Sequence, residues 1–200
     1  MIIKSLEASE TKYQIILSDP PWEYKKLSSH TNQATRHYET MSTDSICVLP
    51  IKNITDKNAV LFLWTTSPKL EEAFKVLNAW GFHYRGIAFV WIKTRKDGKI
   101  KGPQGVRPTF TKSITEYVLV GTTCEIGKPF KTFGDSIHQE ILAPTTKHSE
   151  KPKELYSRIE QLCGLKKRIE LFARDEQPNW DCWGNQLTNN RHNDTDSTHR

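Results

Sequence analysis

The sequence predicts one α/β domain, and three observations support this. Five short apolar runs, rich in β-branched and aromatic residues, have the length of core strands. Segments with helical spacing of apolar residues lie between some of these runs, and strands that alternate with helices imply an α/β sheet. The chain of 200 residues is long enough for one domain with a substantial core. The periodicity leaves open whether the sheet is parallel throughout.

The expected strands are bounded by polar or turn residues and comprise residues 15–17, 60–64, 87–92, 117–120 and 169–172. Two helices are expected, over residues 68–80 and 153–163. Apolar residues recur in both at helical intervals, and Gly81 and Gly164 follow their ends directly. A glycine at that position suits the left-handed conformation that closes a helix.

The domain is expected to extend over residues 1–187 and to be followed by a polar tail. Residues 188–200 include no apolar side chain and are crowded with Asn, Asp, Thr and His, so we expect them to be disordered. His192 and His199 lie in this tail. Isolated histidines in a polar terminus are solvated far more often than they bind a metal, and no metal site is expected.

Cysteine usage and hydropathy favour a cytoplasmic protein. The four cysteines are scattered and form no CxxC pair, which argues against a zinc site and favours buried thiols over disulfides. They are Cys47, Cys124, Cys163 and Cys182. No stretch is apolar enough to span a bilayer, and the N-terminus lacks the apolar core of a secretory signal.

Positive charge is concentrated in one segment. The net charge of +6 and the pI near 9.1 favour a polyanionic partner. Residues 93–112 combine seven cations with three glycines and two prolines, a composition typical of a mobile loop rather than a helix. We expect this loop to grip phosphates through Lys96, Lys99, Lys101 and Arg107. The alternative is a solvated basic loop without a ligand.

An acidic Pro-Pro turn follows the first expected strand directly. Pro20 and Pro21 fix their own φ angles, and Pro20 also restricts Asp19. The Asp19 carboxylate and the Pro20 carbonyl are therefore expected to be two aimed hydrogen-bond acceptors, which suit one NH2 group. Trp22 supplies a flat face on which an extruded base could stack.

This turn suits the methylation of an amine. The lone pair of an aromatic amine is conjugated into the ring, and two hydrogen bonds to the amine weaken that conjugation and aim the lone pair at an electrophile. The candidate catalytic residues are Asp19, Pro20, Pro21 and Trp22, and the chemistry requires no metal or covalent intermediate. The alternative is an ordinary acidic Pro-Pro turn beside a core tryptophan.

Ten segments in a fixed order carry a resemblance to a known family. They are residues 19–24, 37–42, 61–65, 80–82, 89–94, 116–121, 151–156, 168–174, 177–180 and 184–187. With them the chain resembles the adenine N-methyltransferases related to the catalytic subunit of the messenger-RNA adenosine methyltransferase, a family with bacterial and phage members that act on DNA. Each segment alone is weakly specific, whereas their order across most of the chain is highly specific.

The resemblance implies a Rossmann-like methyltransferase fold with a permuted strand order and S-adenosylmethionine as the methyl donor. It assigns donor contacts to Asp19, Glu170, Leu171, Arg174, Asn185 and Gln186. Asn185 and Gln186 match the family's Asn-Gln pair at the adenosine end, and Glu170 suits ribose hydroxyls. Tyr38 either packs against the substrate base or is a loop-packing aromatic.

The sequence also departs from the messenger-RNA branch. Residues 174–177 are shorter than their counterpart and lack its His-Asn pair, and Thr122-Thr123 stand where that branch has a lysine. We therefore expect a bacterial or phage enzyme that methylates the exocyclic amine of adenine in DNA. The alternatives are an RNA adenosine methyltransferase and a non-catalytic nucleic-acid-binding subunit. Nucleic acid is the expected partner, with no membrane contact and with a homodimer or heterodimer as a possible assembly.

Overall fold

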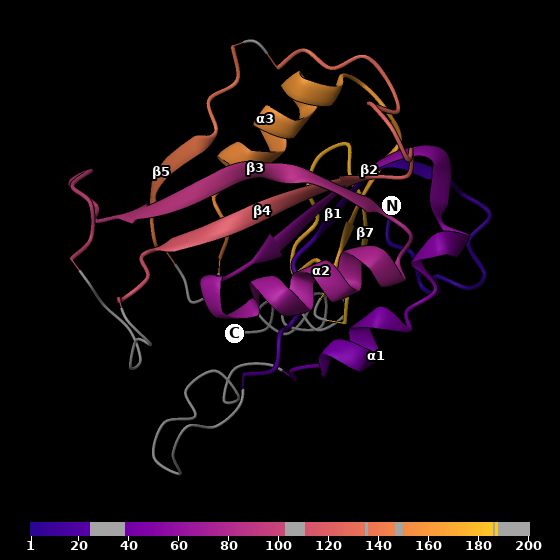
Figure 1. Ribbon diagram of the computed structural model, residues 1–200, viewed down its shortest axis with the longest axis horizontal. Helices are drawn as coiled ribbons and strands as arrows, with labels where there is room; N and C mark the ends of the chain where they lie inside the picture. Colours follow the sequence, from indigo (N-terminus) through magenta and orange to yellow (C-terminus); the bar gives the residue numbers. More distant parts are fainter. Residues whose placement is uncertain (25–38, 103–110, 135, 147–149, 186, 188–200) are drawn as a thin grey trace, which may run out of the picture.

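The computed structural model describes residues 1–24, 39–102, 111–134, 136–146, 150–185 and 187. They include one seven-stranded sheet with the strand order β5-β3-β4-β2-β1-β6-β7 (Figure 1). The strands are β1 (Tyr13–Ser18), β2 (Thr55–Thr65), β3 (His83–Thr94), β4 (Thr115–Thr122), β5 (Glu140–Pro144), β6 (Arg168–Leu171) and β7 (Asp181–Trp183). β1, the first strand of the chain, pairs with β2 on one side and with β6, from far along the chain, on the other.

The directions of the strands gather distant segments at one edge of the sheet. β1 is parallel to β2 and β6, β6 is parallel to β7, and β3 is parallel to β5. β4 is antiparallel to both of its neighbours, β2 and β3. The carboxyl ends of the other six strands therefore lie at one edge, together with the first residues of β4. Ligands of open α/β sheets bind at such an edge.

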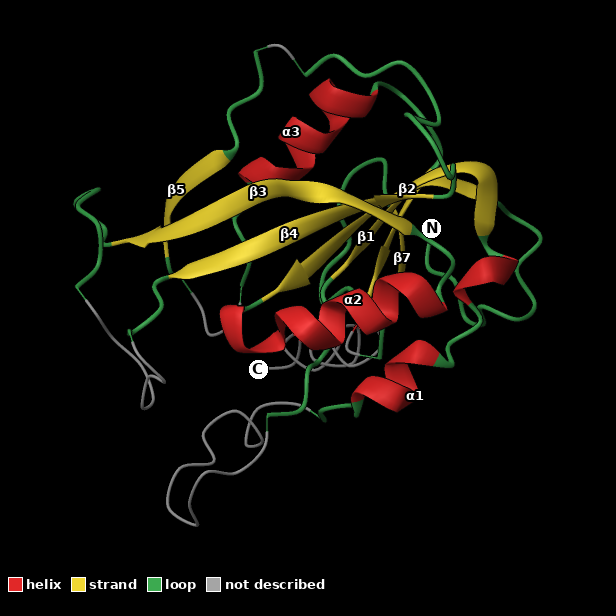
Figure 2. Ribbon diagram, viewed as in Figure 1, coloured by secondary structure: helices red, strands yellow, loops and turns green. Residues whose placement is uncertain are grey.

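Helices cover both faces of the sheet (Figure 2). α1 (Thr43–Cys47) and α2 (Leu70–Ala79) lie on one face, and α3 (Glu154–Cys163) lies on the other. Two short 3-10 helices, η2 (Ile51–Asn53) and η3 (Ser67–Lys69), precede β2 and α2. The sheet is the middle of three layers, which explains why β1 reads as a continuous apolar run: Ile16 packs toward α2, while Ile15 and Leu17 pack toward α3.

All five expected strands and both expected helices are present. The 3-10 helix η3 replaces the first turn of the helix predicted over residues 68–80. Gly81 and Gly164 have φ angles of 84° and 72°, as expected for residues that end a helix. The sequence does not predict β5, β7 or α1. Each is three to five residues long, too short to show a hydrophobic period.

In its described part the basic segment is a loop rather than a helix after β3, as predicted, and this loop contains a tight turn. β3 continues to Thr94, and the chain then turns back on itself. Arg95 N–H donates to the Lys99 carbonyl at 2.8 Å, and Lys101 N–H donates to the Lys93 carbonyl at 3.0 Å. We name residues 93–101 the basic hairpin. Gly98, with a φ of 79°, permits its tight turn.

The structure tests the expectations for the cysteines and for membrane spans but not the expectation for the C-terminal tail. The four cysteines are free thiols, as predicted, but the expected burial holds only for Cys163 and Cys182, because Cys47 and Cys124 are partly exposed. None of the helices that the structure describes is long and apolar enough to cross a membrane. The predicted disorder of residues 188–200 lies outside the described part of the chain and stays a prediction.

Candidate active site at the carboxyl edge of the sheet

The Pro-Pro turn follows β1 at the carboxyl edge of the sheet, as predicted. Trp22 N–H donates to the Pro20 carbonyl at 2.8 Å, and Met41 N–H donates to the Pro21 carbonyl at 2.8 Å. The Pro20 carbonyl therefore already accepts one hydrogen bond. A carbonyl oxygen has two lone pairs, and the described residues use one of them, so the carbonyl can accept a second N–H. The turn is fixed both by its prolines and by a backbone link to Met41, and the second of these is not predicted from sequence.

The turn forms one wall of a cavity of about 120 Å³, which we name the Pro20 cavity. Its lining brings together the end of β1, the end of β2, the start of β4 and two later loops. The lining residues are Asp19, Pro20, Pro21, Trp22, Tyr24, Thr65, Thr66, Glu116, Lys151 and Arg174. All four predicted catalytic residues thus face one cavity.

Trp22 is a buried core residue, as in the alternative interpretation of the turn. Its side chain is 5% exposed, and its Nε1–H donates to the Trp64 carbonyl at 3.1 Å. This hydrogen bond ties the turn to the end of β2. A stacking contact between Trp22 and a base stays a prediction, and the buried indole leaves little surface for it.

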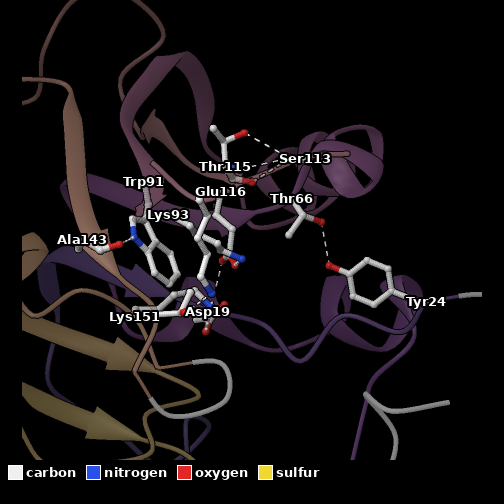
Figure 3. A network of polar contacts seen from close by, with 12 residues as sticks. Asp19, Tyr24, Thr66, Trp91, Lys93, Ser113, Thr115, Glu116, Ala143 and Lys151 are labelled. Carbon is white, nitrogen blue, oxygen red and sulfur yellow. Dashed lines mark hydrogen bonds and ion pairs between the residues drawn. The ribbon is translucent and has the colours of Figure 1, made fainter. Parts of the chain in front are cut away.

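Asp19 begins a chain of alternating charges (Figure 3). Its Oδ2 accepts a hydrogen bond from Lys151 Nζ at 2.8 Å, and the same Nζ lies 3.3 Å from Glu116 Oε2. Glu116 Oε1 lies 2.7 Å from Lys93 Nζ. The two carboxylates and two ammonium groups come from four separate segments, and they neutralise one another beside the Pro20 cavity.

These contacts fix the charge state of the cluster. Burial works against the ammonium charge of Lys151, but Asp19 and Glu116 outweigh it and raise the pKa of Lys151. Burial likewise works against the charge of Glu116, but Lys151 and Lys93 outweigh it and lower the pKa of Glu116. Both groups are therefore ionised at neutral pH.

Tryptophan rings lie beneath both cations. Lys151 Nζ is 5.4 Å from the Trp64 ring centroid, and Lys93 Nζ is 5.0 Å from that of Trp91. The two indoles meet edge to face at 6.3 Å, and Trp91 Nε1–H donates to the Ala143 carbonyl at 2.9 Å. Cation–π contacts of this kind favour the charged form of lysine and restrict its position.

Sequence reasoning missed the roles of Lys151 and Glu116. Both lie in segments that carry the family resemblance, and Glu116 is a charged residue at the start of a core strand. Those two signals could have marked them as functional. Their pairing with Asp19 required the sheet topology, because 132 residues separate Asp19 from Lys151.

A second cavity of about 200 Å³, which we name the Glu170 cavity, adjoins the first. It shares Asp19, Lys151 and Arg174 with the Pro20 cavity. Its remaining lining is rich in polar and charged side chains, namely Glu150, Lys153, Tyr156, Glu170, Phe172, Asp175 and Gln177. Asp19 thus stands between two compartments, as a residue that meets two ligands would.

Glu170 is the most perturbed carboxyl of this cavity. Tyr156 Oη donates to its two carboxyl oxygens at 3.0 and 2.9 Å. Burial raises the pKa of Glu170 to about 7, with added repulsion from Asp19 and Asp175, although Tyr156 and Lys151 work in the opposite direction. A carboxyl with this environment and position is typical of a ligand site.

The other predicted donor contacts are placed less directly. The Leu171 side chain is fully buried in the core, so only its main chain is available to a ligand. Asn185 follows β7 at the same edge of the sheet, outside the lining of the Glu170 cavity, and Gln186 lies outside the described residues. A Cβ on Gly184 would lie 2.3 Å from the Ala173 carbonyl oxygen, so only glycine allows the segment leading to Asn185 to approach the loop after β6.

The predicted nucleic-acid contacts divide into three groups. Lys96 and Lys99 are exposed on the basic hairpin. Lys101 is half-buried, and its Nζ donates to Thr145 Oγ1 at 2.6 Å. Tyr38 and Arg107 lie outside the described residues, and their roles stay predictions.

A wider depression of about 360 Å³ lies at the amino end of β6 and includes Lys166, Lys167 and Arg168 in its lining. None of the predicted site residues that the structure describes lines it. The site is therefore assigned by the convergence of fixed acceptors and perturbed charges at the carboxyl edge, and not by cavity size.

The protein is an α/β protein with a mixed sheet, and its two adjoining cavities lie at the carboxyl edge of the strands, where ligands of open α/β sheets bind. The family model described as MT-A70 matches residues 13–186, and the chain belongs to this adenine methyltransferase family. The resemblance inferred from the sequence segments is thereby confirmed.

Three relatives illustrate the range of the family. The type II methyltransferase M.MunI of a Mycoplasma species is 30% identical over 197 residues, covering 90% of this chain and 80% of that protein. The human N(6)-adenosine-methyltransferase catalytic subunit METTL3 is 32% identical, covering 88% of this chain and 28% of that protein. The Xenopus tropicalis non-catalytic subunit METTL14 is 29% identical, with 94% and 42% covered. The chain thus spans most of the first relative and less than half of the other two.

The raised pKa of Glu170 gives a testable effect on stability. Between pH 4.5 and about 7 its carboxyl is protonated in the folded state and ionised in the unfolded state. The stability that this proton uptake contributes is therefore present at low pH and lost as the pH rises through about 7. We expect the free energy of unfolding of the wild type, relative to Glu170→Gln, to fall by up to about 3 kcal/mol between pH 4.5 and 8, as measured by urea unfolding.

Glu116→Gln is the matched control for this measurement. The pKa of Glu116 is lowered, so its carboxyl is ionised in both states above pH 5.5. The stability difference between wild type and Glu116→Gln should therefore stay constant from pH 5.5 to 8. Parallel curves for wild type and Glu170→Gln would contradict the assigned environment of Glu170.

Proposed function

We propose that this protein transfers a methyl group from S-adenosylmethionine to the exocyclic amine of adenine in DNA. The observation that carries the proposal is the position of Asp19, which lies beside a fixed Pro20 carbonyl and lines both cavities. In the proposed permuted Rossmann-like methyltransferase fold, the catalytic strand β1 precedes the donor-binding strand β6 in the chain, and the two strands pair directly in the sheet.

The residues of the Glu170 cavity fit the donor. S-adenosylmethionine has an ammonium and a carboxylate at its amino-acid end and hydroxyls on its ribose. Asp19 and Lys151 provide opposite charges within 2.8 Å of each other for the amino-acid end. Glu170 provides a carboxylate for the ribose hydroxyls. Arg174 and Asn185 complete the proposed contacts on the described residues.

Catalysis in this proposal depends chiefly on the relative positions of the amine and the methyl donor. Asp19 and the second lone pair of the Pro20 carbonyl would each accept one N–H of the amine, which aims the nitrogen lone pair away from both acceptors and toward the Glu170 cavity. The nitrogen that gains the methyl must lose one N–H proton, and the Asp19 carboxylate would accept it. When bound, S-adenosylmethionine supplies an electrophilic methyl on a positively charged sulfur that leaves as a neutral thioether. Holding the two reactants in register can supply a large part of the rate without a covalent intermediate.

The choice of DNA over RNA rests on the departures of this sequence from the messenger-RNA branch and on the share of each relative that the chain matches. M.MunI is matched over most of its length, whereas the METTL3 match covers 28% of that protein. The METTL14 match favours a second candidate, a non-catalytic subunit that pairs with a catalytic one. Against it stands the cluster of Asp19, Lys151 and Glu116, because a subunit without catalysis does not require two partly buried, ion-paired carboxylates beside a fixed turn.

The direct test is to incubate the purified protein with labelled S-adenosylmethionine and with matched DNA and RNA oligomers, and to identify the methylated base. The proposal expects N6-methyladenine in DNA. Methylation of RNA alone would replace the proposed substrate, while donor binding without methylation of either oligomer would support the non-catalytic candidate.

A further prediction concerns the basic hairpin. If Lys96 and Lys99 contact phosphates, the double variant Lys96→Gln/Lys99→Gln should bind all DNA sequences more weakly and show a flatter dependence of log affinity on log salt. Each lost contact should change the slope by roughly 0.9 for a duplex and 0.7 for a single strand. Fluorescence anisotropy at several salt concentrations measures this.

The matched control is Lys57→Gln/Lys167→Gln, which removes the same charge from two exposed lysines at the amino ends of β2 and β6. This edge of the sheet lies opposite the candidate site. The control should keep the wild-type slope. Equal slopes for all three proteins would show that the basic hairpin is only a solvated turn.

A further inference from the structure

Two aromatic side chains belong to the described lining of the Pro20 cavity, and they differ in exposure. Trp22 is 5% exposed and anchored to β2 through its indole N–H. Tyr24 is 41% exposed. A base can stack only on a ring surface that it can reach. The cavity wall therefore contains the buried Trp22, which anchors the turn, and the exposed ring of Tyr24.

Contacts from η3 and its surroundings hold Tyr24 in place. Its hydroxyl lies 2.8 Å from Thr66 Oγ1, toward which the phenol points in Figure 3. Lys69 Nζ lies 5.4 Å from the ring centroid, and Lys69 is itself 8% exposed and 3.0 Å from Glu72 Oε1. A cation over one face of a ring leaves the other face for a base. A ring already held in position loses little conformational entropy when a ligand binds.

Tyr24 and the amine acceptors line the same small cavity. Asp19 and Pro20 lie at the end of β1, and Thr66, which fixes the Tyr24 hydroxyl, follows the end of the adjacent strand β2. A planar base whose amine meets Asp19 and Pro20 therefore enters a space bounded by Tyr24. Tyr24 would contact the face of the base, and Asp19 and Pro20 would contact its edge.

We propose that Tyr24 is the residue on which the target adenine stacks, and that it is a substrate-binding residue of the reaction proposed above, on which this inference rests. Trp22 then holds the turn in place from within the core. Loss of one base–aromatic stack weakens binding by about 10- to 100-fold. Because stacking depends on the ring and not on its hydroxyl, phenylalanine at this position retains most of the contribution.

The test compares Tyr24→Leu, which removes the aromatic face, with Tyr24→Phe, which keeps it. Each protein is assayed on a DNA oligomer that the wild type methylates, and its binding is measured to that oligomer and to one with an abasic nucleotide at the methylated position. Tyr24→Leu should lower kcat/KM about 10- to 100-fold and lose most of the preference for adenine over the abasic site. Tyr24→Phe should stay within about fivefold of the wild type, and donor affinity by calorimetry should be unchanged in both.

Tyr84→Leu is the matched control. Tyr84 is 43% exposed at the start of β3, away from the cavity, and its replacement should change neither kcat/KM nor the adenine preference. A Tyr24→Leu protein that keeps the wild-type preference for adenine overturns the inference, whether its turnover is normal or reduced. If the wild type methylates no adenine, the proposed function fails and this inference fails with it. If the wild type methylates adenine and Tyr24→Leu is equally active, only this inference fails.

Discussion

Asp19→Ala is expected to abolish methyl transfer while the protein stays folded and keeps most of its affinity for nucleic acid. Asp19 would hold the reacting amine and is the carboxylate partner of Lys151 in the space between the two cavities. Loss of a single preorganised hydrogen-bonding group that acts in the transition state typically costs at least about 10² to 10³ in turnover. Single-turnover assays with labelled donor measure this loss separately from product release.

Lys151 limits the structural cost of this substitution. After the loss of Asp19, Lys151 Nζ still has Glu116 Oε2 at 3.3 Å, so the ammonium is not left without a counter-charge. The free energy of unfolding should therefore fall by less than the about 3–5 kcal/mol typical of a fully broken buried ion pair. Asp19→Asn, which keeps the side-chain volume, serves as the control for packing. Turnover near the wild-type level in the alanine variant would refute the mechanism.

Local patterns in the sequence identify the sheet well. β1, β2, β4 and β6 have apolar runs that are buried on both faces, and their signal survives without any tertiary information. β5 and β7 carry no such signal. β5 alternates exposed and buried positions over five residues at one end of the sheet, and β7 has three residues that depend on pairing with β6. These two strands form because they pair with neighbouring strands, β5 with β3 and β7 with β6.

The same distinction applies to the site. The Pro-Pro turn and Glu170 are predictable, because each follows or ends an apolar run at the edge where ligands bind. The cluster around Asp19 is not, because it joins residues of β3, β4 and the loop before α3 that meet only after the sheet has formed. Burial of Trp22 and exposure of Tyr24 are likewise tertiary properties, and composition gives both residues the same aromatic label.

Lys151→Met is expected to have the second large effect, on both stability and donor binding. Methionine fills a similar volume without charge, and the change leaves Asp19 without Lys151, whereas Glu116 keeps Lys93 at 2.7 Å. Breaking a buried ion pair typically costs about 3–5 kcal/mol, and the remaining contact to Lys93 should keep the loss at or below that range. Affinity for S-adenosylmethionine should fall as well, since Lys151 is the cation proposed for the donor's carboxylate. Urea unfolding and calorimetry measure the two effects separately.

The pH dependence of Lys151→Met distinguishes an electrostatic cause from a packing defect. In the wild type Lys151 lowers the pKa of Glu116, so the stability that this carboxylate contributes is present above pH 4.5 and lost below it. Without Lys151, only Lys93 counters the effect of burial on the charge of Glu116, so the pKa of Glu116 rises and proton uptake at low pH relieves part of the cost. The stability deficit of Lys151→Met should therefore shrink as the pH falls from 7 to 4. The control is Lys69→Met, which removes a buried lysine whose carboxylate partner Glu72 is more exposed than Asp19 and Glu116, and it should show a smaller deficit. A pH-independent deficit in Lys151→Met would assign the loss to packing instead.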